Sequence, residues 1–135
     1  MAARTFTPSE ANSALVQVRP LAERMVEVRA RLTELEAEQR EVVKLVAGNG
    51  HGEGVGEARS PEFARLGREL EQCVAALGAL GVQIKDVESG LLDFPARRDG
   101  ADVLLCWRVG EDTVAWWHAP DDGFAGRRPV DWDDA

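Results

Sequence analysis

Apolar residues recur at alternating intervals of three and four along the first part of the chain. From Val18 onward they fall at Leu21, Met25, Val28, Leu32 and Leu35, and then at Val42 and Val46. This spacing places them on one stripe of an α-helix. Thr7, Pro8 and Glu10 supply the cap, the first-turn proline and the capping-box carboxylate of a helix start. We therefore predict a long amphipathic helix over 7–46, kinked near Pro20 because proline lacks a backbone donor.

A second helix is predicted over 61–80, after a glycine-rich loop over 47–60. Glycine occupies every second position from 48 to 56, and no Lys-Ser or Lys-Thr pair follows as in a phosphate-binding loop. We interpret His51 as a solvated loop residue. The apolar positions of the second helix are Phe63, Leu66, Leu70, Cys73, Leu77 and Leu80. The two helices are expected to form an antiparallel hairpin with coiled-coil-like packing.

The first helix is the longer one, so part of its apolar stripe has no partner on the second. If Val46 lies opposite Phe63, the stripe from Ala11 to about Val28 extends beyond the second helix. Exposing an apolar stripe of this size is costly at about 25 cal/mol per Å². Either the C-terminal region or a second copy of the chain must cover it. We expect both, and hence a homodimer through the helical hairpin.

Beyond Gly81 the hydrophobic period changes to two, which is typical of strands. Turn residues at 88–90, 99–100 and 110–112 divide the segment 82–118 into a small antiparallel β-meander of three or four strands. The strand that starts at Leu91 is expected to end at Pro95. Residues 119–135 are expected to form a loop and an acidic tail. The fold class predicted is α+β, in one domain, with one face of the sheet on the helices.

Composition and charge narrow the class of protein. The 135 residues are 44% hydrophobic and 30% charged, as in a globular domain, and no run is long enough for a membrane span. The net charge of −8 is concentrated after residue 81, where 12 acidic face 6 basic side chains, so nucleic-acid binding is disfavoured. With no signal peptide and two cysteines, we expect a cytoplasmic protein with reduced thiols.

One group of residues in the β-region suggests a metal site. Cys106 and His118, with the carboxylates Glu111, Asp86 and Asp93, are ligand types that suit zinc or a similar divalent transition metal. Their placement depends on the turn between two strands. A three-residue turn pairs Cys106 with Trp116 and puts Cys106 and His118 on one face, whereas a two-residue turn sends His118 to the other face.

Other interpretations of these residues remain open. Cys106 can be a buried structural residue, with His118 hydrogen-bonded at a strand end. A nucleophilic Cys–His pair is disfavoured because the nearby carboxylates raise the pKa of the thiol. Asp86 and Asp93 can also face each other across the first hairpin as an acid/base couple. No catalytic signature is complete, so the sequence favours a protein that is not an enzyme.

A second group of candidates consists of aromatic and arginine side chains. Trp116 and Trp117 are adjacent in a strand and therefore point to opposite faces. Together with Trp107, Arg127 and Arg128 they form a candidate partner interface or anion site, since exposed tryptophan and arginine are frequent interface anchors. The structural alternatives are cross-strand aromatic packing and internal salt bridges to the nearby aspartates.

Several segments together resemble a known family. They are residues 6–12, 18–21, 81–95, 105–111, 117–118 and 123–127. In these segments the chain resembles the prokaryotic family catalogued as domain of unknown function 2203. The resemblance covers nearly the whole chain and implies a small bacterial cytosolic protein, without a reaction, substrate or cofactor.

Two hypotheses for function follow. The first is a non-enzymatic protein-interaction or ligand-binding module that self-associates through its helices. The alternative is a transition-metal-binding protein, with or without enzyme activity, whose site is centred on Cys106 and His118.

Overall fold

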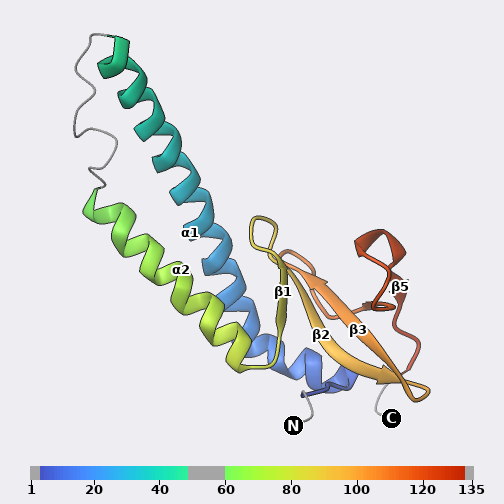
Figure 1. Ribbon diagram of the computed structural model, residues 1–135. Coiled ribbons are helices and arrows are strands. Elements are labelled where there is room, and N and C mark those ends of the chain that lie inside the picture. The colour runs from blue at the N-terminus through green and yellow to red at the C-terminus, as the bar shows by residue number, and fades with distance from the viewer. Residues whose placement is uncertain (1–3, 49–59, 133–135) are drawn as a thin grey trace.

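The protein combines a helical hairpin with an antiparallel sheet, as predicted (Figure 1). The computed structural model describes residues 4–48 and 60–132, so the glycine-rich segment with His51 lies almost entirely outside the described residues. The elements are α1 (Pro8–Gly48), α2 (Pro61–Ala79), β1 (Gln83–Asp86), β2 (Leu91–Arg98), β3 (Ala101–Arg108), β4 (Trp116–His118), the 3-10 helix η1 (Phe124–Gly126) and β5 (Arg128–Pro129).

The helix starts follow the capping signals in the sequence. Thr7 Oγ1 accepts a hydrogen bond from the Glu10 backbone N–H, and Glu10 Oε1 accepts one from the Thr7 N–H, which is the predicted capping box. Ser60 caps α2 in the same way by accepting from Phe63 N. Pro20 lies inside α1, and the helix changes direction within its blue, N-terminal part (Figure 1).

The pairing of the two helices differs from the predicted one. Two ion pairs join them: Arg24 donates to both oxygens of Glu69 at 2.6 and 2.8 Å, and Arg31 contacts Glu62 at 3.2 Å. Helix α2 therefore lies against the middle of α1, and its start is not opposite the α1 C-terminus. The last turns of α1 extend past α2 instead (Figure 1).

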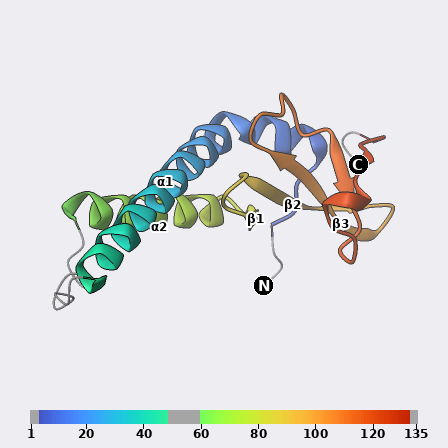
Figure 2. The ribbon, with the colours of Figure 1, turned by 90° about the horizontal axis from the view of Figure 1, so that it is seen from above.

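The N-terminal half of the α1 stripe is covered by the sheet of the same chain. Ala11, Leu15, Val18, Ala22 and Met25 are at most 5% exposed and pack in one core with the inner face of the sheet (Figure 2). The inner-face residues are Leu92, Phe94, Ala96, Val103, Leu105, Trp107 and Trp117. This burial confirms the predicted cover by the β-region. It also removes the uncovered stripe from which the homodimer was inferred. No helix within the described ranges is long and apolar enough to cross a membrane.

Strand β2 was predicted to end at Pro95, but it continues to Arg98. Pro95 lies opposite Leu104 of β3. Its own carbonyl oxygen points away from β3 and accepts a hydrogen bond from Phe6 N at 2.7 Å. The nitrogen and carbonyl of one residue point to the same side of an antiparallel strand. The first residue of β1, Gln83, pairs with Asp93, so β1 does not reach as far along β2 as Pro95. No β1 residue therefore faces the Pro95 nitrogen, and a missing N–H is tolerated at such a position.

The sheet has five strands, in the order β1-β2-β3-β4-β5, rather than the three or four predicted. The additional strand, β5, and the helix η1 lie in the segment 119–135 that was expected to be only loop and tail. Strand β5 has two residues, which is too short to show an alternation of apolar and polar positions in the sequence. The residues after it are docked: Trp132 packs edge-on against Trp117 with ring centroids 5.8 Å apart, and Arg98 pairs with Asp131 at 2.7 Å.

Gly90 provides a test of this arrangement. Its φ is +71°, and a Cβ there would overlap Val109 Cγ2 and lie 2.9 Å from Val26 Cγ2. Gly90→Ala is expected to lower the free energy of unfolding by about 2–4 kcal/mol, since overpacking adds to the cost of a left-handed backbone. Urea unfolding followed by circular dichroism measures the loss.

The matched control is Gly100→Ala. Gly100 has a φ of +81° and open space around its Cβ position, so only the backbone cost of about 1–2 kcal/mol is expected. Equal losses in the two variants would contradict tight packing of α1 against the turn at Gly90.

Candidate functional site

The strand register brings three of the predicted metal ligands together. Asp93 pairs with Cys106 across β2 and β3, Cys106 pairs with Trp116, and His118 pairs with Leu104. Paired residues share a face of the sheet, so Asp93 and Cys106 lie on the same face and His118 is a diagonal neighbour of Cys106. This is the register predicted for the longer turn, although the segment between β3 and β4 runs from 109 to 115.

These three side chains are buried although they lie on the outer face of the sheet, away from the helices. Asp93 and Cys106 are 1% exposed and His118 is 5% exposed. An outer face of a small antiparallel sheet is usually solvated and polar. Here the residues that follow β4, from Pro120 to Phe124, fold over it and border the same cavity as the three side chains. The C-terminal segment thus turns an outer sheet face into an enclosed site.

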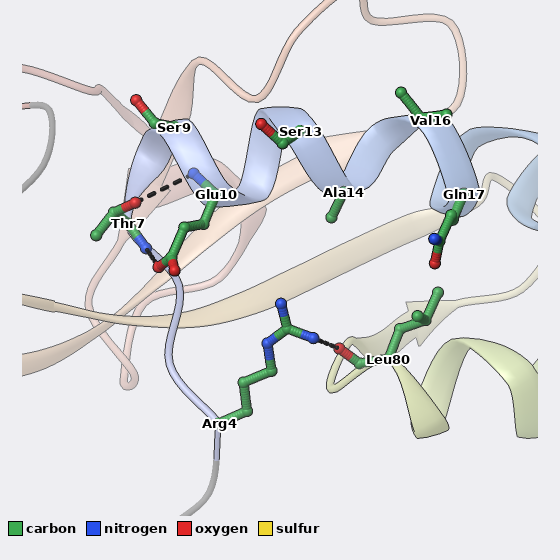
Figure 3. Close-up of a pocket in the computed structure, with 9 residues that line it drawn as sticks. All are labelled: Arg4, Thr7, Ser9, Glu10, Ser13, Ala14, Val16, Gln17 and Leu80. Carbon is green, nitrogen blue, oxygen red and sulfur yellow. Dashed lines mark hydrogen bonds between the residues drawn. The ribbon is translucent and has the colours of Figure 1, made fainter.

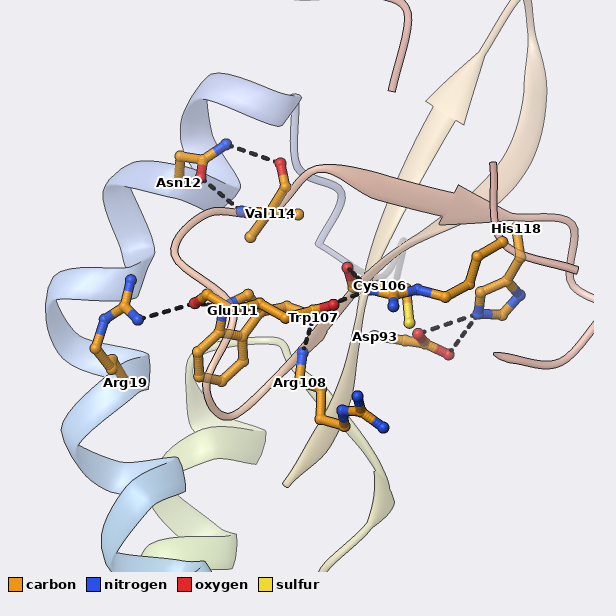
Figure 4. Close-up of polar contacts among 10 residues, drawn as sticks. Asn12, Arg19, Asp93, Cys106, Trp107, Arg108, Glu111, Val114 and His118 are labelled. Carbon is orange, nitrogen blue, oxygen red and sulfur yellow. Dashed lines mark hydrogen bonds and ion pairs between the residues drawn. The ribbon is translucent and has the colours of Figure 1, made fainter. Parts of the chain in front are cut away.

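The cluster has a defined geometry (Figure 4). His118 Nε2 is 3.1 Å from each carboxylate oxygen of Asp93, and the Cys106 thiol lies beside the same carboxylate. One ligand atom from each residue lies within 4.8 Å of the others. The second ring nitrogen, His118 Nδ1, is 2.9 Å from the carbonyl oxygen of Ala119.

The contacts of the imidazole restrict how its two nitrogens can be satisfied. The Ala119 carbonyl is an acceptor only, so Nδ1 carries a hydrogen and donates it. In a neutral ring, Nε2 then presents a lone pair to the Asp93 carboxylate at 3.1 Å, and the two groups repel. A proton shared between the ring and the carboxyl, or a metal cation between the two residues, makes the arrangement favourable.

Cys106 is a thiol rather than a thiolate in this environment. Burial raises the pKa of the thiol to about 11, and the charges of Asp93 and Glu111 act in the same direction, whereas Arg127 opposes them. A nucleophilic thiolate at neutral pH is therefore disfavoured, as the sequence indicated. A metal cation, if coordinated, would deprotonate a thiol of this kind outright.

A cavity of about 230 Å³ opens directly onto the cluster. Besides Asp93, Cys106 and His118, it is bordered by Lys85, Leu91, Leu104, Pro120, Asp122, Gly123 and Phe124. Apolar walls with few convergent polar groups are typical of small-molecule sites. The cluster can therefore interact with a molecule of limited size.

The other two predicted ligands lie outside the cluster. Glu111 Oε1 accepts from the Arg108 backbone N–H and from Arg127 Nη2, both at 2.8 Å. Burial tends to raise the pKa of Glu111, but these hydrogen bonds and the arginine charges outweigh it and the pKa is lowered. Asp86 is exposed and accepts from both the backbone N–H and the hydroxyl of Ser89. The predicted Asp86–Asp93 couple does not form, because Asp93 pairs with Gln83.

Helix α1 holds the segment that sets the position of β4, which the sequence analysis missed. Asn12 accepts from Val114 N at 2.8 Å and donates to Val114 O at 3.2 Å, in the manner of a neighbouring strand (Figure 4). Arg19 donates to the carbonyls of Glu111 and Asp112 at 3.0 and 2.7 Å. The available signal was Asn12 itself, a polar residue directly beside a buried position of the apolar stripe.

The aromatic and arginine candidates are largely used within the chain. Trp107 is fully buried and donates to Glu111 O, and Trp117 is 7% exposed in the core. Trp116 points to the opposite face, as predicted, where Arg127 stacks over it. Arg127 also pairs with Glu111, which is the predicted internal salt bridge. Arg128 is exposed and lies over the Trp117 ring.

A second, wider hollow lies between the start of α1 and the end of α2 (Figure 3). It has a volume of about 890 Å³, and at its edge Arg4 donates to the Leu80 carbonyl at 3.1 Å. This hollow is open to solvent, and neither Asp93 nor His118, both buried and ionisable, borders it. The chemistry of the described residues therefore points to the smaller cavity.

Fold and site together define an α+β protein in which a helical hairpin supports a five-stranded antiparallel sheet with a buried Asp–Cys–His cluster on its outer face. Residues 4–130 match the family described as Uncharacterized conserved protein (DUF2203), and the chain belongs to this family. No curated protein and no solved structure matches the chain.

The contact between Asn12 and Val114 can be tested directly. Asn12→Asp keeps the acceptor for Val114 N–H but replaces the donor with a carboxylate oxygen that faces the Val114 carbonyl. We expect the free energy of unfolding to fall by about 1–3 kcal/mol in a urea titration. Ser13→Ala, at an exposed neighbouring position, is the control and should change it by less than about 0.5 kcal/mol. An Asn12→Asp variant as stable as the parent would show that this contact does not hold the segment.

Proposed function

We propose that this protein binds a single divalent transition metal, of the zinc type, through Asp93, Cys106 and His118. The observation that carries the proposal is the buried contact of an imidazole nitrogen with a carboxylate, with a thiol beside them. A metal cation between the two groups would satisfy that contact, and the three side chains are ligands of the same class of metal.

The geometry is compatible with coordination after small side-chain movements. Ligand atoms at about 2.0–2.3 Å from a tetrahedral zinc ion stand roughly 3.3–3.8 Å from one another. The three ligand atoms of the cluster lie within 4.8 Å, so a shift of about 1 Å suffices. The hydrogen bond from Nδ1 to Ala119 O fixes the tautomer and leaves Nε2 for the metal, as second-shell carbonyls do in metal sites.

The charge balance also supports a divalent cation. A thiolate at Cys106 and a carboxylate at Asp93 contribute two negative charges, which a divalent ion neutralises within a buried site. With the proton alone, the site instead holds an imidazolium–carboxylate ion pair and a neutral thiol. These two states differ in the Cys106 sulfur, which is a ligand in one and a bystander in the other.

Three protein ligands and an adjoining cavity are typical of a metal site with an open coordination position. Structural zinc sites use four protein ligands, whereas open sites keep a position for water or a substrate. The proposed function is accordingly a metal site that binds or activates a small molecule.

The proposal predicts stoichiometric binding of Co²⁺ or Zn²⁺ to the purified protein. Co²⁺ should give a thiolate-to-metal absorption band, because Cys106 becomes a ligand. Cys106→Ser should abolish the band, and Asp93→Asn and His118→Ala should weaken metal binding at least tenfold. Calorimetric and absorption titrations measure the affinity and the band.

Cys73→Ser is the matched control, since Cys73 is the other buried cysteine and lies in the helix core. It should retain the band and the affinity, with circular dichroism to check that each variant is folded. Absence of metal binding in the parent protein, or an undiminished thiolate band in Cys106→Ser, would refute the proposal.

Self-association through the helices is a second candidate function. It is supported by a surface on the distal part of α1, not by the stripe from Ala11 to Val28 on which the prediction was based. The distal part of α1 carries Val42 and Leu45, which are 47% and 69% exposed. Val42 and Leu35 border a hollow with Phe63 of α2, where a helix from a second copy can bury its own apolar side chains.

This candidate predicts a dimer in size-exclusion chromatography with light scattering. The double variant Val42→Glu and Leu45→Glu should be monomeric, because charges oppose burial of this surface. Val16→Glu is the control: Val16 is 81% exposed on a distant part of α1, so the dimer should persist. A parent protein that is monomeric at high concentration excludes this function.

A further inference from the structure

We infer that the cavity beside the Asp93–Cys106–His118 cluster binds a small carboxylate with a short apolar body, whose carboxylate lies between Lys85 and the metal. This inference rests on the proposed metal site and specifies the ligand class that the site takes. It is carried by the position of Lys85 at the cavity and by the apolar walls of the cavity.

Lys85 occupies an irregular position at the edge of the sheet. Ile84 pairs with Leu92, but Asp86 pairs with the adjacent residue Leu91, so Lys85 is the extra residue of a β-bulge in β1. Bulges are frequent beside active sites, where they redirect a side chain out of the regular alternation. Here the bulge residue borders the cavity of the Asp–Cys–His cluster.

Within residues 4–48 and 60–132, the Lys85 ammonium has no ion pair or hydrogen bond. The other lysine of the chain, Lys44, pairs with Glu41 one turn earlier on α1. Most arginines near the sheet are likewise matched with an acidic partner, as Arg97 is with Asp102 and Arg98 with Asp131. Lys85 thus offers a cation to a ligand in the cavity.

The walls set the size and polarity of that ligand. Leu91, Leu104, Pro120 and Phe124 supply apolar surface. The volume of about 230 Å³ corresponds to about eight waters at ~30 Å³ each. A molecule with one anionic group and a few carbon atoms fits this combination.

Among the charged groups that border the cavity, Lys85 is the one that attracts an anion. A divalent metal is neutralised by the Cys106 thiolate and Asp93, so the metal centre itself carries no net charge. A carboxylate oxygen can still serve as the fourth ligand, because borderline metals accept oxygen donors. Asp122 also borders the cavity, and its carboxylate repels an incoming anion. Lys85 and Asp122 should therefore have opposite effects on ligand affinity.

The test uses Co²⁺-loaded full-length protein and follows the visible Co²⁺ absorption as small molecules are added. Isovalerate should perturb the spectrum at saturable concentrations. Acetate should bind at least tenfold more weakly, since each buried CH₂ contributes about fourfold in affinity. Isovaleramide, which has the same apolar body without the charge, should leave the spectrum unchanged.

Matched variants separate the contribution of Lys85 from that of the metal. Lys85→Gln should weaken isovalerate binding about threefold or more, and Asp122→Asn should strengthen it about twofold, with Co²⁺ affinity unchanged in both. Lys44→Gln is the control and should bind isovalerate like the parent. If Lys85→Gln binds isovalerate as the parent does, or isovaleramide binds equally well, the inference is overturned while the metal site stands. Failure of the parent to bind Co²⁺ overturns both.

Discussion

The structure depends on the packing of the N-terminal half of α1 against the inner face of the sheet. Ala11, Leu15, Val18, Ala22 and Met25 are buried there, together with the inward-facing residues of β2 and β3. This contact decides which face of the sheet is closed by helices. Because strand side chains alternate, it also decides that Asp93, Cys106 and His118 point away from the helices. The outer face would then be open to water, and the segment after β4 has to cover it.

The same helix also positions the site through polar contacts. Asn12 and Arg19 hold the backbone between β3 and β4, and that connection determines which residue of β4 faces Cys106. A slip of one residue would turn His118 to the other side of the strand. The apolar stripe and the polar edge of α1 thus act together, since one orients the sheet and the other maintains the register of its fourth strand.

The site concentrates groups that are costly to bury. Two of the three side chains are ionisable acids, and the third is an imidazole whose Nε2 lies 3.1 Å from a carboxylate oxygen. Such a cluster contributes less to stability than apolar residues of the same size would. Pro120 to Phe124 enclose it next to a cavity that Lys85 borders from a β-bulge, an arrangement that agrees with the binding role proposed above.

The sequence by itself determined the two helices, the strands β1 to β4 and their order, because helix caps, hydrophobic period and turn residues are local signals. It also named Asp93, Cys106 and His118 as candidate ligands, but it could not separate them from Asp86 and Glu111. The tertiary structure decided that separation, along with the helix pairing, the passage of β2 through Pro95, the strand β5 and the position of Lys85. Each of these depends on contacts between residues far apart in the chain, such as Phe6 with Pro95 or Asn12 with Val114. Local patterns carry no information on which distant partner satisfies a backbone group or a buried charge.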